Sequence, residues 1–283
     1  MEASERERRS YAERKALEIG FARPRCTLAV SLTGMRCSLD CAHCGGHYLR
    51  GMTSIEQADA VGMSSCLISG GCDRHGRVPF CSQLERVAAL RPGRIMNWHV
   101  GMIDEEQMRA IAPLVDVISF DFLVDAQTIR EVYGLDYTAG DYLRTYDMLR
   151  RYARVVPHLT LGLLRGQFRG EYRALEALRT SGLGELVVLV FIPTAGTRYA
   201  HCPPPSPDEV VAFLTAAHNM LPGIPIYLGC MRPGGSYRRY LDPLAVQAGV
   251  SKIVNPSATA VAMADQLGLC ARWENECCVI QRH

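Results

Sequence analysis

Three cysteines near the N-terminal end of the sequence have a spacing that suits metal binding. Cys37, Cys41 and Cys44 follow the pattern C-x₃-C-x₂-C within one short segment. Thiolates are soft ligands that select zinc or iron–sulfur clusters, and three of them in one loop can wrap one side of a metal centre. The segment therefore predicts a metal site, either structural or catalytic.

Two kinds of metal centre fit these three ligands. Zinc would take a fourth nitrogen or sulfur ligand to close a tetrahedron, and His43, His47 and Cys72 each offer one. A [4Fe–4S] cluster held by three cysteines would instead leave one iron without a protein ligand. Since an open iron can bind a small molecule, the same spacing would then form a catalytic site.

The other cysteines also favour metal binding. Twelve cysteines in 283 residues exceed ordinary usage but stay below that of disulfide scaffolds. A chain long enough to bury a large core does not need disulfides, so metal binding or chemistry is the better explanation. Cys26 and Cys66 are expected to be small core residues, and Cys81 and Cys270 have no predicted role. The remaining five are candidate ligands of a second cluster: Cys72, Cys202, Cys230, Cys277 and Cys278.

Short apolar segments typical of buried strands alternate with helical segments along the chain. Strands are predicted at residues 26–32, 64–69, 95–100, 115–122, 155–164, 186–193, 224–230 and 252–254. Helices are predicted at residues 81–90, 104–111, 125–133, 141–152, 171–180, 206–220, 240–248 and 259–267. Strands that alternate with helices form parallel sheets, and eight such units favour a closed (βα)8 barrel of the TIM type. A doubly wound open sheet is the alternative.

These elements divide the chain into three parts. Residues 1–24 are predicted to form an N-terminal helical extension, residues 25–269 the barrel, and residues 270–283 a cysteine-containing tail. Active sites of such barrels lie at the C-terminal ends of the strands. The three-cysteine loop follows the first predicted strand and most other candidate residues follow later strands, so we expect them to meet at this mouth. The tail is expected to fold over the mouth.

Composition and charge exclude several other classes of protein. The sequence is 48% hydrophobic and 21% charged, with a formal net charge of +2, which is not typical of a disordered chain or a dedicated nucleic-acid binder. Basic clusters have acids close by, such as Arg238 and Arg239 near Asp242, which indicates a solvated face. No apolar run approaches the roughly 18 residues of a membrane helix, and the N-terminus has the pattern of neither a signal nor a transit peptide. A cytoplasmic protein is expected.

The cysteine loop and its position resemble the radical S-adenosylmethionine (SAM) superfamily. Its members carry C-x₃-C-x₂-C after the first strand of a βα barrel, commonly with an aromatic residue before the third cysteine, where this sequence has His43. Gly70 and Gly71 resemble the superfamily's motif for the methionine end of SAM, although Cys72 and Asp73 follow where many members have an acid. The resemblance implies a [4Fe–4S] cluster whose open iron binds SAM, and cleavage of SAM to a 5′-deoxyadenosyl radical.

The same resemblance suggests further contacts with SAM. Asp121 is a candidate for the ribose hydroxyls, with a helix cap as the alternative role. Arg165 is a candidate for the SAM carboxylate, with an exposed loop arginine as the alternative. Phe191 and Ile192 could flank adenine but are explained as well by core packing, and His99 is expected to be structural.

A narrower resemblance is to the biotin-synthase-like group, in particular to a subunit of the two-protein lipoyl synthase of archaea and anaerobic bacteria. It rests on residues 31–37, 44–49, 68–73, 165–166, 191–197, 230–235 and 276–278. It implies sulfur insertion into an unactivated C–H bond of an octanoyl chain on a lysine of a lipoyl carrier protein, with a second [4Fe–4S] cluster as sulfur donor. The implied partners are that carrier protein, a sister radical SAM subunit and a one-electron donor such as ferredoxin or flavodoxin.

Two other functions are compatible with the sequence. A single-cluster radical SAM mutase, lyase or methyltransferase of the same group would cleave SAM without a second cluster. A non-catalytic zinc or Fe–S protein would bind metal without cleaving SAM, and it would unfold when the metal is removed. Neither a nucleic acid nor a membrane is an expected partner.

Overall fold

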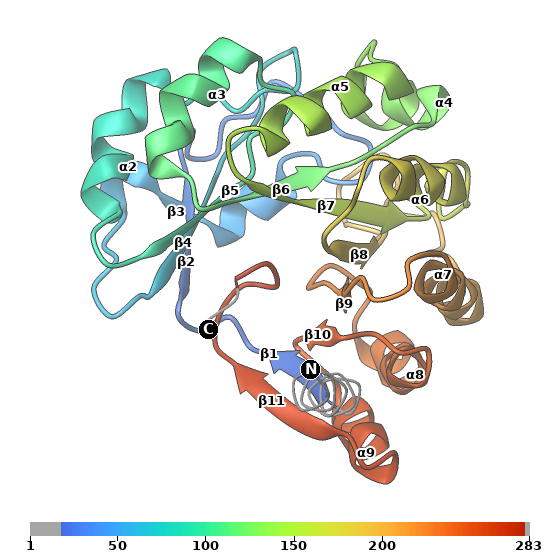
Figure 1. Cartoon of the computed structure of the whole chain (residues 1–283). Coiled ribbons are helices and arrows are strands. Elements are labelled where there is room, and N and C mark those ends of the chain that lie inside the picture. The colour runs from blue at the N-terminus through green and yellow to red at the C-terminus, as the bar shows by residue number, and fades with distance from the viewer. Residues whose placement is uncertain (1–17, 281–283) are drawn as a thin grey trace, which may run out of the picture.

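Eleven strands form one sheet in the computed structural model, which describes residues 18–280 (Figure 1). In chain order they are β1 (Glu18–Ala22), β2 (Thr27–Ser31), β3 (Thr53–Ser54), β4 (Ser65–Ser69), β5 (Ile95–Trp98), β6 (Val117–Asp121), β7 (Arg154–Leu161), β8 (Leu186–Val190), β9 (Ile226–Leu228), β10 (Lys252–Val254) and β11 (Cys270–Glu274). The order across the sheet is β11-β1-β10-β9-β8-β7-β6-β5-β4-β2-β3, and all neighbours are parallel. Strands β4 to β10 lie side by side in chain order, as in a barrel, whereas the strand order of a doubly wound sheet reverses.

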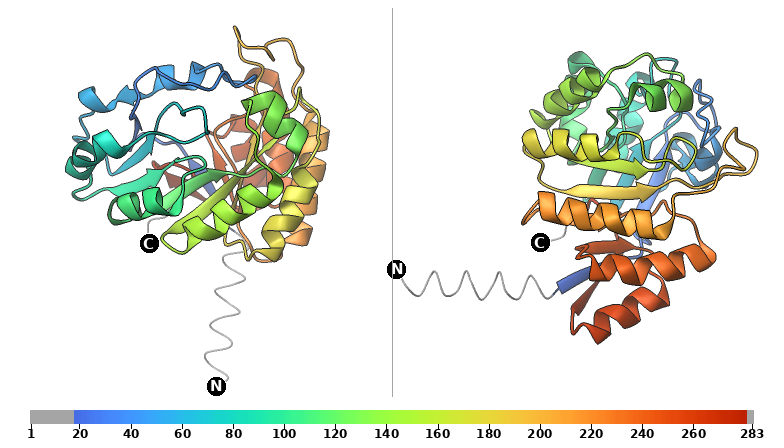
Figure 2. Two further views of the ribbon diagram at one scale, coloured as in Figure 1. Left: turned by 90° about the horizontal axis from the view of Figure 1, so that it is seen from above. Right: turned by 90° about the vertical axis from the view of Figure 1, so that its right-hand side faces the viewer.

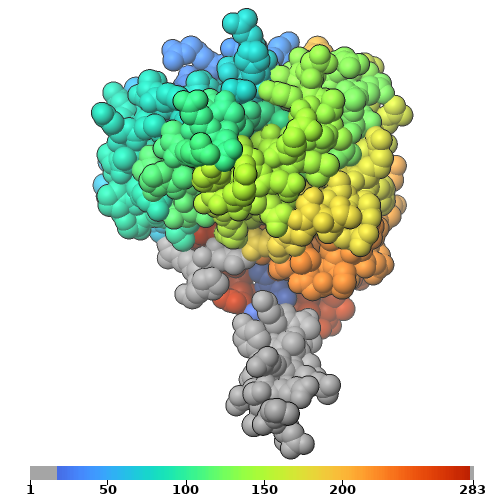
Figure 3. Space-filling model, turned by 45° about the horizontal axis from the view of Figure 1, so that its top comes forward, coloured from blue at the N-terminus to red at the C-terminus, as the bar shows by residue number. Residues whose placement is uncertain are grey.

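The helices cover the outer side of the curved sheet (Figure 1). They are α2 (Leu84–Leu90), α3 (Glu105–Ile111), α4 (Ala126–Thr128), α5 (Ala139–Arg150), α6 (Glu171–Thr180), α7 (Pro207–Met220), α8 (Gly235–Gln247) and α9 (Ala258–Gln266). Figure 3 shows α5, α6 and α7 packed side by side along the outer surface. Capping boxes fix the starts of α3, α5 and α7, because side chains at the N-cap and third positions satisfy each other's backbone N–H groups.

All eight predicted strands are present, as β2 and β4–β10, and each predicted helical segment contains a helix. The prediction missed β1, β3 and β11. Residues 1–17 of the predicted helical extension lie outside the described residues, but its residues 18–22 form β1 and not a helix. Four of these five residues are buried, so tertiary packing and not a helical pattern determines their conformation.

The predicted closure into a complete barrel is wrong for the described residues, because the edge strands β3 and β11 do not pair. The consecutive strands β1 and β2 lie on opposite sides of this opening. Two backbone hydrogen bonds join the segment between β1 and β2 to the residues at and after the end of β11. The Arg23 N–H donates to the Glu274 carbonyl at 2.8 Å, and the Cys26 N–H donates to the Asn275 carbonyl at 2.9 Å. The C-terminal tail therefore spans the opening.

The tail was predicted to cover the mouth, but it lies at the other end of the barrel, where the strands begin. Glu276 accepts hydrogen bonds from Thr27 and Ser65, which begin β2 and β4, and the Val279 carbonyl accepts one from Arg154, which begins β7. Figure 2 (left) shows the loops around residues 50 and 200 projecting together at the other end of the sheet. The tail closes the end formed by the strand N-termini because its apolar residues pack against the inward side chains there.

Replacing Glu276 by alanine is expected to destabilise the protein by about 1–3 kcal/mol. The Glu276 carboxylate is 4% exposed and accepts from three hydroxyls, those of Thr27, Ser64 and Ser65, which would lose their partner. Urea unfolding of the two proteins measures the difference. The exposed Glu106 gives the matched control, since Glu106→Ala should stay within about 0.5 kcal/mol of the wild type. Equal effects of the two changes would contradict this role of Glu276.

Among the described residues, no helix has the length and apolar character that crossing a membrane requires.

Candidate active site

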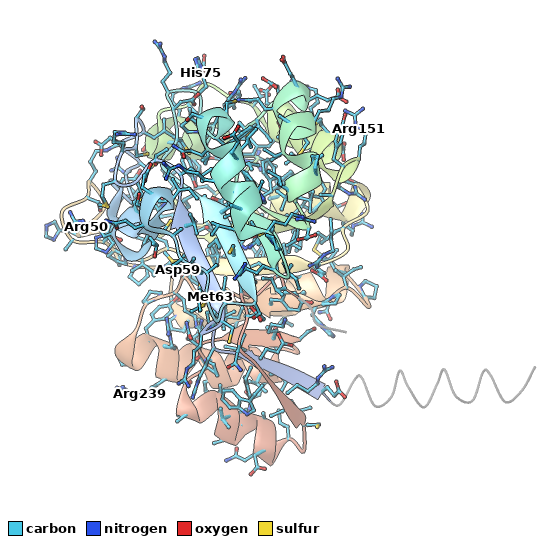
Figure 4. The ribbon with its side chains drawn as sticks, turned by 90° about the vertical axis from the view of Figure 1, so that its left-hand side faces the viewer. Arg50, Asp59, Met63, His75, Arg151 and Arg239 are labelled. Carbon is cyan, nitrogen blue, oxygen red and sulfur yellow. The ribbon has the colours of Figure 1, made fainter. Side chains whose placement is uncertain are left out.

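The three-cysteine loop lies directly after β2, at the C-terminal end of the strands. Its backbone is tied to two other loops at Ala42, whose N–H donates to the Val132 carbonyl at 2.7 Å and whose carbonyl accepts from Tyr199 N–H at 3.0 Å. The Cys41 carbonyl accepts from the N–H groups of Cys44 and Gly45 in a tight turn. The loop leads into η1 (His47–Gly51), which carries Arg50 on its outer surface (Figure 4).

A fourth cysteine joins this loop. Cys72 follows β4, and its carbonyl accepts from the Ser38 N–H at 2.7 Å. Burial, together with the charge of Cys37, raises the pKa of the Cys72 thiol to about 12. Burial and the charges of Cys44, Cys37 and Cys72 raise the pKa of Cys41 as well. The four thiols thus share one region, and this position separates Cys72 from the other candidates for a second cluster.

Gly71 allows the cysteine loop to pack against the end of β4. A Cβ atom at Gly71 would lie 2.1 Å from the Arg36 carbonyl oxygen and 2.6 Å from the Cys37 Cβ. The Gly71 N–H also donates to Thr33 Oγ1 at 2.7 Å, and a Cβ at Gly70 would come within 3.1 Å of that oxygen. The glycine pair therefore positions the cysteine loop, whatever it contacts on its other side.

Alanine at position 71 is expected to displace the loop and to destabilise the protein by about 1–3 kcal/mol, as overpacking does. The change should also lower the iron content after anaerobic reconstitution, since Cys37 would have to move. Gly51→Ala is the matched control because a Cβ there meets no atom within 4 Å. Thermal unfolding and iron analysis of both variants measure the two effects; a Gly71→Ala protein with wild-type iron content and stability would refute the packing role.

His43 stands between the second and third cysteines of the loop. Its ring packs edge-on against Tyr133 with 5.6 Å between centroids, and burial lowers its pKa to about 4, so the ring is neutral near pH 7. Its Nδ1 atom is buried without a hydrogen-bond partner in the described structure. The predicted contact of His43 with the cofactor stays a prediction.

Asp121 ends β6 and faces histidines from two neighbouring strands. Its Oδ1 lies 3.5 Å from His99 Nε2. Burial alone would raise the pKa of Asp121, but the charge and hydrogen bond of His99 outweigh it, and with smaller effects of His158 and His43 they lower that pKa to about 2. The alternative role as a helix cap does not apply, because Asp125 caps α4 by accepting from the Thr128 N–H. Asp121 is therefore an ionised carboxylate available at the mouth.

His99 was expected to be structural, and the structure makes it the partner of Asp121. Burial would lower the pKa of His99, but the charge and hydrogen bond of Asp121 outweigh this and raise it. The side chains of His99 and Asp121 are 34% and 42% exposed. Both residues lie at the C-terminal ends of strands, β5 and β6. Neither side chain is therefore packed into the core.

Arg165 lies further out on the same side. It has a left-handed backbone conformation (φ 57°), and its side chain is 61% exposed, with Nη2 3.4 Å from Glu131 Oε2 and the guanidinium above the ring of Tyr199. Of the two other candidates for SAM contacts, Phe191 is buried against Tyr199, while Ile192 is partly exposed. The predicted contacts of Arg165 and of the glycine pair with SAM stay predictions.

A second group of thiols lies deeper in the barrel. Cys277 Sγ is 3.8 Å from Cys278 Sγ, and their hydrogen bond lowers the pKa of Cys277 and raises that of Cys278. The charge of Cys230, just after β9, contributes to the raised pKa of Cys278. Of the five candidates for a second cluster, Cys277 and Cys278 are therefore in contact, while Cys230 is exposed at the C-terminal end of β9. Cys202 lies elsewhere, because it packs with Tyr199 in the loop at the mouth.

Two residues of this inner group were missed by the sequence analysis. His158, in β7, has Nε2 3.9 Å from Cys278 Sγ, and Asn97, in β5, has Nδ2 3.7 Å from Cys277 Sγ. Both are polar residues within otherwise apolar strands, and that is the signal that could have found them. Among residues 18–280, no three or more His, Cys, Asp and Glu side chains have the arrangement that a single metal ion takes.

The sequence matches no protein-family model and no curated protein sequence. The structure, however, is similar to solved structures that share its barrel. Methylornithine synthase (PylB) has a TM-score of 0.63 at 12% identity, over 92% of this chain and 86% of that one. HMG-CoA lyase from Brucella melitensis has 0.56 at 11% identity, over 92% and 93%. SuiB from Streptococcus suis, solved with S-adenosylmethionine bound, has 0.55 at 11% identity, over 76% and 52%. At these identities the likeness shows the fold and no more.

Proposed function

We propose that this chain is a cytoplasmic radical SAM enzyme. The observation that carries the proposal is the loop with Cys37, Cys41 and Cys44 at the C-terminal end of β2, where a backbone hydrogen bond from Ser38 to Cys72 ties it to the end of β4. Active sites of such barrels lie at this end. The fold is also that of a protein solved with S-adenosylmethionine bound.

The residues present fit a [4Fe–4S] cluster. The loop presents thiols, the ligands of such clusters, and it rests on a glycine that no larger residue can replace without a clash. A cluster of this kind with SAM bound supplies one-electron cleavage of the sulfonium and a 5′-deoxyadenosyl radical. We assign Cys37, Cys41 and Cys44 as ligands, and Asp121 as acceptor for the ribose hydroxyls, because it is ionised and lies near the loop. Arg165 would pair with the SAM carboxylate at the rim.

We further propose that the reaction is sulfur insertion into an octanoyl chain on a lipoyl carrier protein, with a sister radical SAM subunit and a ferredoxin or flavodoxin as partners. The support is the pair of thiols Cys277 and Cys278 inside the same barrel, with Cys230 directly after β9 as a further candidate ligand. These thiols would hold an auxiliary Fe–S cluster, which would supply the sulfide and take up the electron left over when a C–H bond of the substrate is replaced by a C–S bond.

Anaerobic iron and sulfide counts, EPR spectra and 5′-deoxyadenosine formation test both levels of the proposal. The wild type is expected to hold two clusters and, with SAM and dithionite, to form 5′-deoxyadenosine. The Cys37/Cys41/Cys44→Ala variant should keep one cluster and should form no 5′-deoxyadenosine. The Cys277/Cys278→Ser variant should keep the loop cluster and 5′-deoxyadenosine formation but add no sulfur to an octanoylated carrier peptide.

Each level has its own contradicting outcome. Formation of 5′-deoxyadenosine by the loop variant at the wild-type rate would contradict the radical SAM assignment. Loss of all iron from the loop variant would contradict the second cluster and would favour a single-cluster radical enzyme. Zinc in place of iron in the wild type, with no SAM cleavage, would favour a structural metal protein.

A further inference from the structure

The segment from Thr194 to Tyr199, after β8, contacts the cysteine loop at several points. The Tyr199 N–H donates to the Ala42 carbonyl at 3.0 Å, and the Thr194 hydroxyl lies 3.2 Å from that of Tyr48. Thr194 and Tyr199 are 5% and 4% exposed, so both ends of the segment are anchored in the protein interior. The segment therefore gives the cysteine loop a fixed support.

Arg198 joins this segment to the cysteine loop through its side chain. Its Nη2 donates to the Asp40 carbonyl, directly before Cys41, at 2.8 Å, and its Nη1 donates to the Glu131 carbonyl at 3.4 Å. Arg198 is exposed, so these hydrogen bonds and not apolar packing account for its position. The planar guanidinium directs two N–H groups at two separate acceptors, a geometry that the compact ammonium of lysine does not share. Arg198 thus ties the residue before Cys41 to a second loop of the mouth.

The Glu131 carbonyl belongs to the last turn of a short helix. The helix α4 continues into η5 (Ile129–Tyr133), which ends at Gly134 in a left-handed conformation (φ 69°). Carbonyls in the last turn of a helix have no partner within the helix, and here that of Glu131 accepts from Arg198. The C-terminal end of a helix carries partial negative charge, which is unfavourable beside thiolates. The guanidinium of Arg198 places a positive charge between this helix end and the cysteine loop.

We infer that Arg198 is a positioning residue for the cysteine loop, and that its charge raises the reduction potential of the cluster that the loop would hold. The inference deepens the proposed function, on whose loop cluster its second part rests. A reduced iron–sulfur cluster carries one more negative charge than the oxidised cluster, and charge and hydrogen bonding around the cluster set its potential. A positive charge held at the residue before Cys41 therefore favours the reduced form.

Alkylation of Cys41 in the metal-free, full-length protein tests the positioning role. Mass spectrometry follows the rate of its reaction with iodoacetamide in the wild type and in Arg198→Gln. Without the hydrogen bond to Asp40 the loop should open more often, so the rate should rise about fivefold in the variant, as for the loss of one hydrogen bond.

An EPR redox titration of the loop cluster tests the effect of charge. The Cys277/Cys278→Ser background removes any contribution from a second cluster. In this background Arg198→Gln should shift the midpoint potential to more negative values at unchanged iron content. Arg198→Lys, which keeps the charge, should have a potential between those of Arg198→Gln and the unchanged arginine. A residue that only supported the fold would not give this order.

Arg179→Gln is the matched control and should change neither the alkylation rate nor the potential, because Arg179 pairs with Glu176 on its own helix, α6. Equal alkylation rates in Arg198→Gln and the control would overturn the positioning role. An unchanged potential in Arg198→Gln, or an equally large shift in Arg198→Lys, would overturn the effect of charge. A protein that binds no iron would refute the proposed function and with it the effect on the potential, whereas the alkylation rate would still decide the positioning role.

Discussion

Replacing Cys41 by serine is expected to reduce 5′-deoxyadenosine formation to the background seen without protein. Cys41 is the middle one of the three proposed ligands in the loop, and serine lacks the soft thiolate that iron–sulfur clusters require. Serine keeps the size of the side chain, and the backbone turn at Cys41 uses only its carbonyl, so the fold should be retained. Anaerobic assay with SAM and dithionite measures the product, and circular dichroism checks the fold.

Cys81→Ser is the matched control for this prediction. Cys81 is exposed at the start of η3 (Cys81–Gln83), before α2, and should form product at the wild-type rate. Product formation by Cys41→Ser at more than a small fraction of that rate would remove Cys41 from the ligand set. It would leave Cys72, the fourth thiol of the region, as the ligand to examine next.

Replacing Asp242 by asparagine is expected to destabilise the protein by about 3–5 kcal/mol, the range for breaking a buried ion pair. Arg232 and Asp242 are both 0% exposed and form a two-pronged pair, with Nε–Oδ1 at 2.8 Å and Nη2–Oδ2 at 2.9 Å. Asp242 also accepts from the Ser257 N–H at 2.8 Å. Asparagine would leave the buried guanidinium without a counter-charge, and urea unfolding would show the loss directly.

An exposed pair gives the control for Asp242. Asp147 lies 3.8 Å from Arg150 on α5 with its side chain 58% exposed, and Asp147→Asn should cost less than about 1 kcal/mol. In addition, the double change Arg232→Met with Asp242→Leu should be less destabilising than the sum of the two single changes, because it leaves no buried charge unpaired. Additive effects, or a small effect of Asp242→Asn, would contradict this account.

The same pair shows where sequence reasoning fails. Asp242 lies close in sequence to Arg238 and Arg239. This mixture of charges predicted a solvated face, and the prediction is wrong for Asp242. In the structure Asp242 is buried against Arg232, ten positions earlier and before the start of α8. Charge patterns show which residues are near in sequence, but the strand-to-helix turn determines which of them meet.

The eight central strands were predictable because each is a run of apolar residues bounded by turns, a strictly local signal. The strands β1 and β11 were not, since β11 is largely exposed and both depend on pairing across nearly the whole chain. The loop cysteines were found from spacing alone. His158 was missed because only the tail, entering from the end opposite to the predicted one, brings thiols to it.

The position of β1 has a consequence for the order of folding. Of the described strands β1 is synthesised first, yet its partners β10 and β11 are synthesised last, with Gly20 opposite Lys252 and Arg272. Contacts so distant in sequence form slowly, and domains fold as the chain emerges. The cysteine loop and the loops at Val132 and Tyr199 that hold it are therefore synthesised before the tail that brings Cys277 and Cys278 into the barrel. We expect the loop group to acquire its metal first, and the inner group only after the last strand has docked.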